Sequence, residues 1–358
     1  MTEAATPARE VLVEIKGLVK QFTIPGTKAA VHACSDVDLT LYKGETLGVI
    51  GESGSGKTTL GRCVLRLISP TAGEVIFEGR DVTKMSAAEV RHLRTDMQIV
   101  FQEPFDALNP QITIWKQVVE PLRIHTKMST QERRQRALEL LALVGLPPSV
   151  ADAIPAMLSP GALQRASIAR AISTSPKLVV LDEPTSALPP EAEAEIMALL
   201  KRLQRELGLT YIFISHDLAL VRSICDRVAI MYLSQVVELG SREEIFNHPR
   251  HPYSRALLAS VRLPDPRQRR DQSNRAERLE GEIPSPINLP QGCYLATRCP
   301  YVKDRCREEP QRLHAAGQSD HFARCWRMTE GDLTEVEIER TREQRRADYR
   351  AARLAAGI

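Results

Sequence analysis

The sequence predicts an α/β fold, in which helices cover a sheet of buried strands. Short apolar segments alternate with segments of helical pattern across roughly residues 10 to 245. Three of these segments, residues 46–50, 177–182 and 210–215, are apolar along most of their length. Such continuous runs are typical of parallel strands that are buried on both faces of the sheet.

Helices are expected between these strands, over residues 58–68, 129–146 and 191–207. The third segment has the clearest amphipathic pattern, because its aliphatic residues recur at helical spacing. These residues are Ile196, Leu199, Leu200, Leu203 and Leu207. Glutamates near the start of this segment suit the positive end of the helix dipole.

The composition limits the classes of protein to consider. The chain has 358 residues, of which 43% are hydrophobic, so it can bury one large core and an additional module. Its 48 Lys and Arg residues nearly balance its 45 Asp and Glu residues, which excludes the chain-wide basic field that favours nucleic-acid binding. The first ten residues lack an apolar run, and no segment approaches the roughly 18 apolar residues of a membrane span. We therefore expect a soluble, cytoplasmic chain.

The stretch GESGSGKT, residues 51–58, directly follows a predicted strand and begins a predicted helix. This G-x-x-x-x-G-K-[ST] pattern is typical of a phosphate-binding loop, because its glycines let successive N–H groups turn toward phosphate oxygens. We expect Lys57 to reach the β- and γ-phosphates and the Thr58 hydroxyl to ligate Mg²⁺. The predicted nucleotide-binding residues here are Gly51, Ser53, Gly54, Ser55, Gly56, Lys57, Thr58 and Thr59.

A second motif, LVVLDEP at residues 178–184, ends a predicted strand in two carboxylates. Asp182 can hold Mg²⁺ through water, and Glu183 can position or deprotonate an attacking water molecule. An apolar strand that ends in Asp-Glu is common by itself. Downstream of a phosphate-binding loop it becomes a specific pairing, which predicts a nucleotide hydrolase.

Five motifs occur in a characteristic order: GESGSGKTT, VFQEPFDALNP, LSPGALQRASIARA, LVVLDEPTSAL and ISHDLALV. Together they resemble the ATP-binding subunit of an ABC transporter, and the resemblance covers about residues 10–245. It implies a P-loop NTPase with a RecA-like core, a β-subdomain and a helical subdomain at about residues 105–170. It also implies ATP and Mg²⁺ as cofactors.

The resemblance assigns roles to residues that lie in matching motifs. Gln102 is expected to ligate Mg²⁺, to sense the γ-phosphate and to link the site to the helical subdomain. His216 is expected to contact the γ-phosphate, and Phe22 to be an aromatic platform for adenine. Ser159 and Gly161 belong to the signature segment, which in this family completes the nucleotide site of a partner subunit.

Residues 246–330 are rich in Pro, Arg and Cys, and they predict a separate, loop-rich module. They are similar to the C-terminal extension of oligopeptide and dipeptide importer ATPases, some of which hold a [4Fe-4S] cluster. The corresponding residues here are Cys293, Cys299, Cys306 and Cys325. Their spacing differs from a zinc ribbon, yet zinc and free buried thiols stay open beside the cluster. Residues 331–358 predict a charged helix, either solvated or in contact with acidic lipid or a partner.

The signature segment departs from the family pattern. Where Leu-Ser-Gly-Gly-Gln is usual, residues 158–162 are LSPGA. Pro160 has no N–H group and cannot donate to a γ-phosphate oxygen. Pro189 and Pro190 stand where the family usually has Asp, although proline is also favoured in the first turn of a helix. Both departures affect the partner's nucleotide, so we expect an asymmetric heterodimer in which this chain's own site hydrolyses ATP.

The sequence therefore predicts the ATPase subunit of an ABC importer for peptides or a related solute, at the cytoplasmic face of the inner membrane. The expected partners are a second ATPase subunit, two transmembrane permease subunits and, indirectly, an extracytoplasmic solute-binding protein, with no nucleic acid. One alternative is a nucleotide-binding but catalytically weak regulatory subunit of such a transporter. The other is a soluble ABC ATPase outside transport, although the single P-loop and the lack of sustained heptads argue against it.

Overall fold

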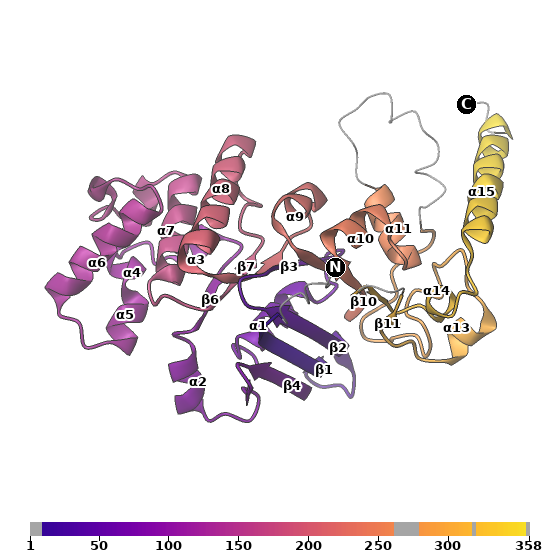
Figure 1. Ribbon diagram of the computed structural model, residues 1–358, viewed down its shortest axis with the longest axis horizontal. Coiled ribbons are helices and arrows are strands. Elements are labelled where there is room, and N and C mark those ends of the chain that lie inside the picture. The colour runs from indigo at the N-terminus through magenta and orange to yellow at the C-terminus, as the bar shows by residue number, and fades with distance from the viewer. Residues whose placement is uncertain (1–8, 261–278, 317–319, 356–358) are drawn as a thin grey trace, which may run out of the picture. The chain divides into compact units, whose positions relative to one another are not determined.

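The computed structural model describes residues 9–260, 279–316 and 320–355 (Figure 1). The described residues form two compact units. Unit 1 takes its residues from Met1–Leu18, Asp38–Val49 and Thr58–Asp226, and unit 2 from Val19–Val37, Ile50–Lys57 and Arg227–Ile358. The predicted domain boundaries, including the helical subdomain at about 105–170, remain predictions.

Parallel strands form the centre of unit 1. They are β3 (Thr46–Ile50), β6 (Met97–Val100), β7 (Leu178–Asp182) and β8 (Thr210–Ile214), in the order β3-β8-β7-β6. Every residue of β3, β7 and β8 is buried, which confirms the three strands predicted from their continuous apolar runs. Asp182 lies opposite Ile214 in the register. The carboxyl end of β7 therefore lies at the same sheet edge as the carboxyl end of β8.

A second sheet has the strand order β2-β1-β4-β5. Its strands are β1 (Val11–Thr23), β2 (Ala30–Tyr42), β4 (Ala72–Phe77) and β5 (Arg80–Asp81). Within unit 1, the backbone N–H of Gly17 donates to the Asp38 carboxylate over 2.8 Å. The two sheets and the surrounding helices confirm the predicted α/β class.

The helices of unit 1 follow the strands in sequence. They are α1 (Lys57–Val64), α2 (Ala87–Leu93), α3 (Pro104–Ala107), α4 (Ile114–Val118), α5 (Glu120–His125), α6 (Thr130–Leu143), α7 (Pro160–Ile172), α8 (Pro190–Leu207) and α9 (Leu218–Ile224), with short 3-10 turns at Pro148–Val150 and Pro155–Met157. Helices α3, α4 and α6 contact α7 and form a helical group with it (Figure 1).

Two predicted helices end earlier than expected, whereas the helix predicted over residues 191–207 ends at Leu207 as predicted. The helix predicted over residues 129–146 is α6, which ends at Leu143. The helix predicted over residues 58–68 ends at Val64, because Arg66 adopts a φ of +52° that no right-handed helix contains. Helix α8 buries four of its five predicted apolar residues, whereas Leu207 is exposed. Leu207 is the last residue of α8, which stops at the left-handed Gly208.

Unit 2 contains an antiparallel arrangement in the order β9-β10-β12-β11. The strands are β9 (Arg227–Tyr232), β10 (Gln235–Ser241), β11 (His314–Ala315) and β12 (Phe322–Ala323). The helices of this unit are α10 (Arg242–Asn247), α11 (Pro252–Ala259), α13 (Asp304–Glu308), α14 (Trp326–Thr329) and α15 (Glu335–Ala355). A two-residue turn, Leu233 and Ser234, joins β9 to β10.

Helix α15 corresponds to the charged helix predicted in residues 331–358, of which residues 356–358 lie outside the described residues. Its first turns are anchored rather than solvated. Ile338 is fully buried and packs with Tyr301 and Leu333, and Glu337 forms an ion pair with Arg327 at 2.8 Å. The charged pattern of the sequence did not indicate this attachment.

Unit 2 also contains a buried polar cluster around Glu238, which is fully buried. The Glu238 carboxylate accepts hydrogen bonds from the backbone N–H groups of Arg250, at 2.7 Å, and His251, at 2.8 Å. His321 Nε2 lies 2.7 Å from the same carboxylate. His251 Nδ1 in turn accepts from the backbone N–H of Tyr253 at 3.1 Å, so His251 caps the start of α11.

Burial lowers the pKa of His251 from 6.5 to about 4, although the nearby Glu238 opposes this shift. Between pH 6.5 and 4 the unfolded chain therefore binds a proton at this residue that the folded chain does not. The contribution of neutral His251 to stability is fully present above pH 6.5 and is lost as the pH falls toward 4. At about 1.4 kcal/mol per pKa unit, the loss is of the order of 3 kcal/mol.

We predict that the thermal midpoint of unfolding falls more steeply between pH 6.5 and 4.5 in the natural chain than in His251→Asn. Asparagine supplies an acceptor for the Tyr253 N–H but does not titrate in this range. The measurement is calorimetry of both proteins across this pH range. If the thermal midpoints of the two proteins fall equally with pH, the lowered pKa of His251 does not account for the loss of stability.

Among the described residues, no helix is both long enough and apolar enough to cross a membrane.

Candidate functional site

Two positions of the predicted phosphate-binding loop have a backbone conformation and surroundings that only glycine fits. Gly51 and Gly56 have φ angles of +152° and +104°. A Cβ atom at Gly56 would lie 2.0 Å from the carbonyl oxygen of Ala33, and one at Gly51 would lie 2.1 Å from that of Met231. The close approach of neighbouring backbone therefore requires glycine at both positions.

Three carbonyl groups of the loop accept hydrogen bonds within unit 2. Lys57 Nζ donates to the carbonyl oxygens of Gly51 and Glu52, each at 2.9 Å. The carbonyl of Ser55 accepts from the backbone N–H of Ser234 at 3.0 Å. The side-chain hydroxyl of Ser55 is buried without a hydrogen-bond partner among the described residues. The predicted phosphate-binding lysine thus stabilises its own loop.

Helix α1 begins with Lys57, and the residue after it, Thr58, is hydrogen-bonded to the end of β7. The Thr58 hydroxyl donates to Asp182 Oδ1 at 2.9 Å. Asp182 is buried at the carboxyl end of β7. A hydroxyl and a carboxylate at this distance suit Mg²⁺, which prefers oxygen ligands and keeps several of its water molecules. Thr58 and Asp182 therefore fit the metal role that the motifs predict.

Three predicted catalytic side chains meet at Glu183, directly after Asp182. Gln102 Nε2 donates to Glu183 Oε2 at 3.2 Å, and His216 Nδ1 lies 3.2 Å from the same oxygen. The Glu183 side chain is 17% exposed and that of His216 is 65% exposed. Gln102 follows β6 and His216 follows β8, so neighbouring strands deliver the three groups to one edge.

The backbone of Glu183 is in an uncommon conformation for a residue with a side chain. Its φ angle is +47°, and its N–H donates to the carbonyl oxygen of Ile214 at 2.9 Å. Such a conformation costs of the order of 1–3 kcal/mol and occurs preferentially at functional sites. The bond to β8 stabilises it. Motif spacing predicted the carboxylate but not this backbone conformation.

The other predicted nucleotide-binding residues, which lie outside the loop, do not belong to the Glu183 group. Phe22, near the end of β1, is 41% exposed, and Lys20 Nζ lies 4.8 Å from the centre of its ring. Ser159 is the N-cap of α7, and its hydroxyl accepts from the backbone N–H of Ala162 at 3.3 Å. Pro160 is the first residue of α7. Ser159 therefore interacts within its own helix and not with the Glu183 group.

The four C-terminal cysteines gather around one pocket. This pocket is lined by Cys293, Cys299, Cys306 and Cys325, by apolar side chains, and by His251, Gln311 and Arg327. Burial raises the pKa of the Cys293 thiol to about 12 and that of Cys325 to about 11. Trp326 Nε1 donates to Cys306 Sγ at 3.3 Å. Within the described ranges, however, no three His, Cys, Asp or Glu side chains are arranged to hold a single metal ion.

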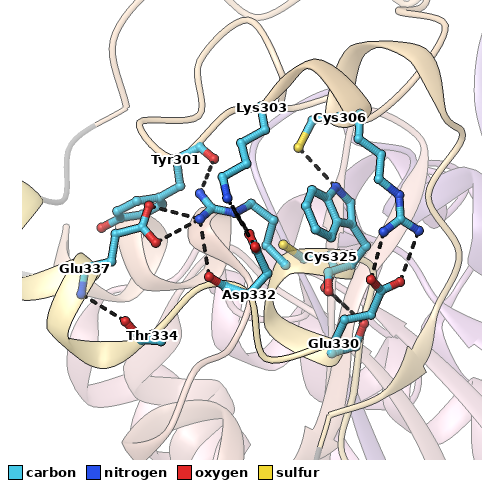
Figure 2. A network of polar contacts seen from close by, with 12 residues as sticks. Tyr301, Lys303, Cys306, Cys325, Glu330, Asp332, Thr334 and Glu337 are labelled. Carbon is cyan, nitrogen blue, oxygen red and sulfur yellow. Dashed lines mark hydrogen bonds and ion pairs between the residues drawn. The ribbon is translucent and has the colours of Figure 1, made fainter.

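A network of charged residues supports this pocket (Figure 2). The Arg327 guanidinium donates to the carbonyl oxygen of Tyr301 at 2.7 Å and to Glu337 at 2.8 and 2.9 Å, and it also contacts Asp332. Figure 2 shows Tyr301, Asp332 and Glu337 around this guanidinium. Through Arg327, which lines the pocket, the network joins the segment before α13 to α15.

Sequence comparisons identify both parts of the chain. The ABC transporter family matches residues 34–186, and the oligopeptide/dipeptide transporter C-terminal region matches residues 237–306. The oligopeptide transport ATP-binding protein OppF of Escherichia coli is 43% identical over 333 residues, which are 91% of this chain and 98% of that protein. The chain belongs to the oligopeptide/dipeptide branch of the ABC transporter ATPases. It is therefore an ATPase subunit coupled to transport, as the motifs predicted.

Further relatives agree with this membership. The oligopeptide transport ATP-binding protein AppF of Bacillus subtilis is 43% identical over 325 residues, which are 88% of this chain and 97% of that protein. Among solved structures, the dimeric cassette MJ0796 in a post-hydrolysis state bound to ADP and Pi has a TM-score of 0.60 and 32% identity. It covers 64% of this chain and 99% of its own length. The cassette cbiO1 of Clostridium perfringens has a TM-score of 0.59 and 28% identity, over 71% of this chain and 96% of its own. These likenesses confirm the P-loop NTPase fold of the ABC type.

The glycines of the loop give a matched pair of variants. Gly54→Ala faces open space, and only its φ of +77° opposes the substitution. We predict that Gly56→Ala lowers the free energy of unfolding by more than the roughly 1–3 kcal/mol that an unfavourable φ costs, because its Cβ also meets the Ala33 carbonyl. Thermal unfolding of both variants without nucleotide tests whether Gly56→Ala is less stable than Gly54→Ala. Equal midpoints would contradict the close approach.

Proposed function

We propose that this chain hydrolyses ATP at its own phosphate-binding loop and thereby energises the import of peptides. The observation that carries the proposal is the group formed by Glu183, Gln102 and His216 directly after the Thr58–Asp182 pair. A carboxylate held by two polar side chains beside a pair of Mg²⁺-type ligands suits the activation of a water molecule. The 43% identity to OppF and AppF supports peptides as the transported solute.

The proposed nucleotide site has two parts, the phosphate-binding loop at residues 51–58 and the carboxylates at the end of β7, where the Thr58 hydroxyl donates to Asp182. Residues of the loop bind the phosphates through backbone N–H groups, and Lys57 turns from the carbonyls of its own loop to the phosphates. Phe22 supplies the platform for adenine. The loop residues in this role are Gly51, Ser53, Gly54, Ser55, Gly56, Lys57, Thr58 and Thr59.

Mg²⁺ is the proposed metal, and its ligands would be Thr58, Asp182 and Gln102. When bound, it neutralises charge on the phosphate oxygens. The protein's own contribution is to place Glu183 so that its carboxylate can orient or deprotonate the attacking water. His216 and Gln102, which hold that carboxylate in the present structure, would contact the γ-phosphate region when ATP is bound.

The proposed partner is a second ATPase subunit, with which this chain forms a heterodimer. Ser159 and Gly161 would face the partner's nucleotide, where Pro160 removes one N–H donor. Loss of one oriented donor to transition-state charge typically costs about 10² to 10³ in rate. The ATP site that contains LSPGA would therefore turn over slowly, and the site that contains Glu183 would be the active one.

Peripheral attachment to two permease subunits, at the cytoplasmic face of the inner membrane, completes the proposed assembly. An extracytoplasmic solute-binding protein would deliver peptide to those permeases. A catalytically weak regulatory subunit is the competing function, and the departures at Pro160, Pro189 and Pro190 favour it. The intact group around Glu183 favours hydrolysis instead.

The test is ATP turnover by the purified membrane complex. We predict that Glu183→Gln lowers turnover by about 10²- to 10⁴-fold, because glutamine cannot accept a proton from water. The matched control is the equivalent glutamate change in the partner ATPase, which should have a much smaller effect. If only the partner's change abolishes turnover, this chain is the weak, regulatory subunit.

We propose further that the four-cysteine pocket holds an iron–sulfur cluster. The convergence of four thiols on one apolar pocket favours it, because cysteine thiolates are the usual cluster ligands. The ligands would be Cys293, Cys299, Cys306 and Cys325, and binding would deprotonate them, including Cys293 and Cys325, whose pKa values burial has raised. A cluster would cross-link segments of unit 2 that are far apart in sequence.

The prediction is that the full chain, incubated without oxygen with ferric iron, sulfide and a thiol reductant that converts part of the iron to the ferrous state, retains iron and acid-labile sulfide and absorbs visible light. Cys306→Ser should lose both, whereas Cys63→Ala, in α1, should keep them. Retention of zinc without sulfide would assign a zinc site instead. Retention of neither metal would assign free buried thiols.

A further inference from the structure

One residue of the phosphate-binding loop, Glu52, is held by side chains from the C-terminal part of unit 2. Its backbone N–H donates to the hydroxyl oxygen of Tyr253 at 3.1 Å. Its carboxylate lies 3.7 Å from the guanidinium of Arg298. Its carbonyl oxygen accepts from Lys57 Nζ at 2.9 Å. Three groups of a single residue are therefore engaged, two of them by residues more than 200 positions away.

Tyr253 has little freedom to move away from this bond. It is 1% exposed and lies in the first turn of α11. Its ring packs against Tyr232, with 4.6 Å between the ring centres. Its backbone N–H donates to His251 Nδ1 at 3.1 Å. A buried hydroxyl fixed from both sides is a rigid acceptor for the N–H of Glu52.

Arg298 is held by the turn that carries two of the cysteines. Its backbone N–H donates to the carbonyl oxygen of Leu295 at 2.8 Å, and that of Cys299 donates to the same oxygen at 2.9 Å. The guanidinium lies 5.8 Å from the centre of the Tyr232 ring, and the Arg298 side chain is only 10% exposed. The cationic partner of Glu52 is therefore fixed by the wall of the cysteine pocket.

A proline-rich segment reaches the same loop. The carbonyl oxygen of Pro286 accepts from the backbone N–H of His32 at 2.9 Å. Ile283, Pro284 and Pro286 line a pocket whose other side is formed by loop residues 52–55. The C-terminal part of unit 2 thus shares a pocket with the loop, in addition to holding Glu52.

We propose that Tyr253 and Arg298 are positioning residues for the nucleotide. They hold Glu52, and through the Glu52 carbonyl they hold Lys57, so that the loop keeps its phosphate-binding shape before ATP arrives. A loop that is already ordered loses less conformational freedom on binding, which raises affinity. This inference rests on the proposed function, because it requires that the loop binds the phosphates of ATP.

The first test is the affinity of the full chain for a non-hydrolysable ATP analogue. Tyr253→Phe removes the hydroxyl that accepts from Glu52 and keeps the ring. We predict that the dissociation constant rises by about threefold to tenfold, the range expected for one hydrogen bond. In the membrane complex the same variant should raise KM for ATP and leave kcat nearly unchanged.

The matched control is Tyr211→Phe, which also removes one buried tyrosine hydroxyl. That hydroxyl donates to the carbonyl oxygen of Leu200 at 3.2 Å, within unit 1 and away from the loop. We expect Tyr211→Phe to lower the thermal midpoint of unfolding without raising the dissociation constant. If Tyr253→Phe also changes only the midpoint, its role is structural and the proposal is wrong.

The ion pair gives a second, independent test. Glu52→Gln and Arg298→Gln should each weaken binding of the analogue, and the double variant should be no weaker than the worse single variant, because both remove the same interaction. Arg298→Lys, which keeps the positive charge, should recover part of the affinity. Additive losses would overturn the role of Arg298.

Lys57→Ala separates this inference from the function on which it rests. If Lys57→Ala abolishes binding while Tyr253→Phe and Arg298→Gln bind as the natural chain does, the loop binds ATP but needs no support, and only the inference fails. If Lys57→Ala itself leaves binding unchanged, the proposed nucleotide site fails first.

Discussion

A phosphate-binding loop that turns its N–H groups toward an anion turns carbonyl groups away from it, and those carbonyl groups that are buried need donors from the protein. This requirement accounts for much of the structure around residues 51–58. Lys57 supplies the donor for Gly51 and Glu52, which explains why this cationic side chain is buried. Ser234, at the turn between β9 and β10, supplies the donor for Ser55. The shape of the loop therefore depends both on Lys57, which belongs to the loop, and on the β9–β10 turn, which lies outside it.

The turn between β9 and β10, which supplies the donor for Ser55, has a strained backbone. Leu233 and Ser234 both have positive φ angles, +42° and +69°, as a two-residue hairpin turn with the correct twist requires. Glycine or asparagine usually fills such positions, so these residues carry strain. Ser234 offsets it through three bonds: its N–H donates to Ser55, its hydroxyl to Ser35, and its carbonyl accepts from the Ser35 N–H. The strained turn and the loop thus stabilise each other.

Sequence reasoning succeeded where a local pattern fixes the outcome. Continuous apolar runs predicted β3, β7 and β8, and the end of β7 placed Asp182 and Glu183 at the sheet edge. It failed where the outcome depends on distant backbone. The left-handed Arg66 ends α1 early without a glycine to signal it. Tyr253 reaches Glu52 across 201 positions, and no motif spacing encodes that contact. The same limit applies to the anchoring of α15, whose charged sequence conceals the buried Ile338.

The two departures from the family pattern have a common structural position, since both place proline at the start of a helix. Pro160 is the first residue of α7 and Pro190 the first of α8. The first N–H groups of a helix have no partner within it, so proline there removes no helical hydrogen bond, and its fixed φ favours the helical conformation. Ser159 still caps α7 through Ala162. The prolines are therefore compatible with the helices that they begin, and in the proposed heterodimer any loss would fall on the nucleotide of the partner subunit. Such a substitution does not harm its own chain and affects only the ATP site across the interface. It is tolerable if hydrolysis takes place at the other site, which contains Glu183. This is the asymmetry proposed for this transporter.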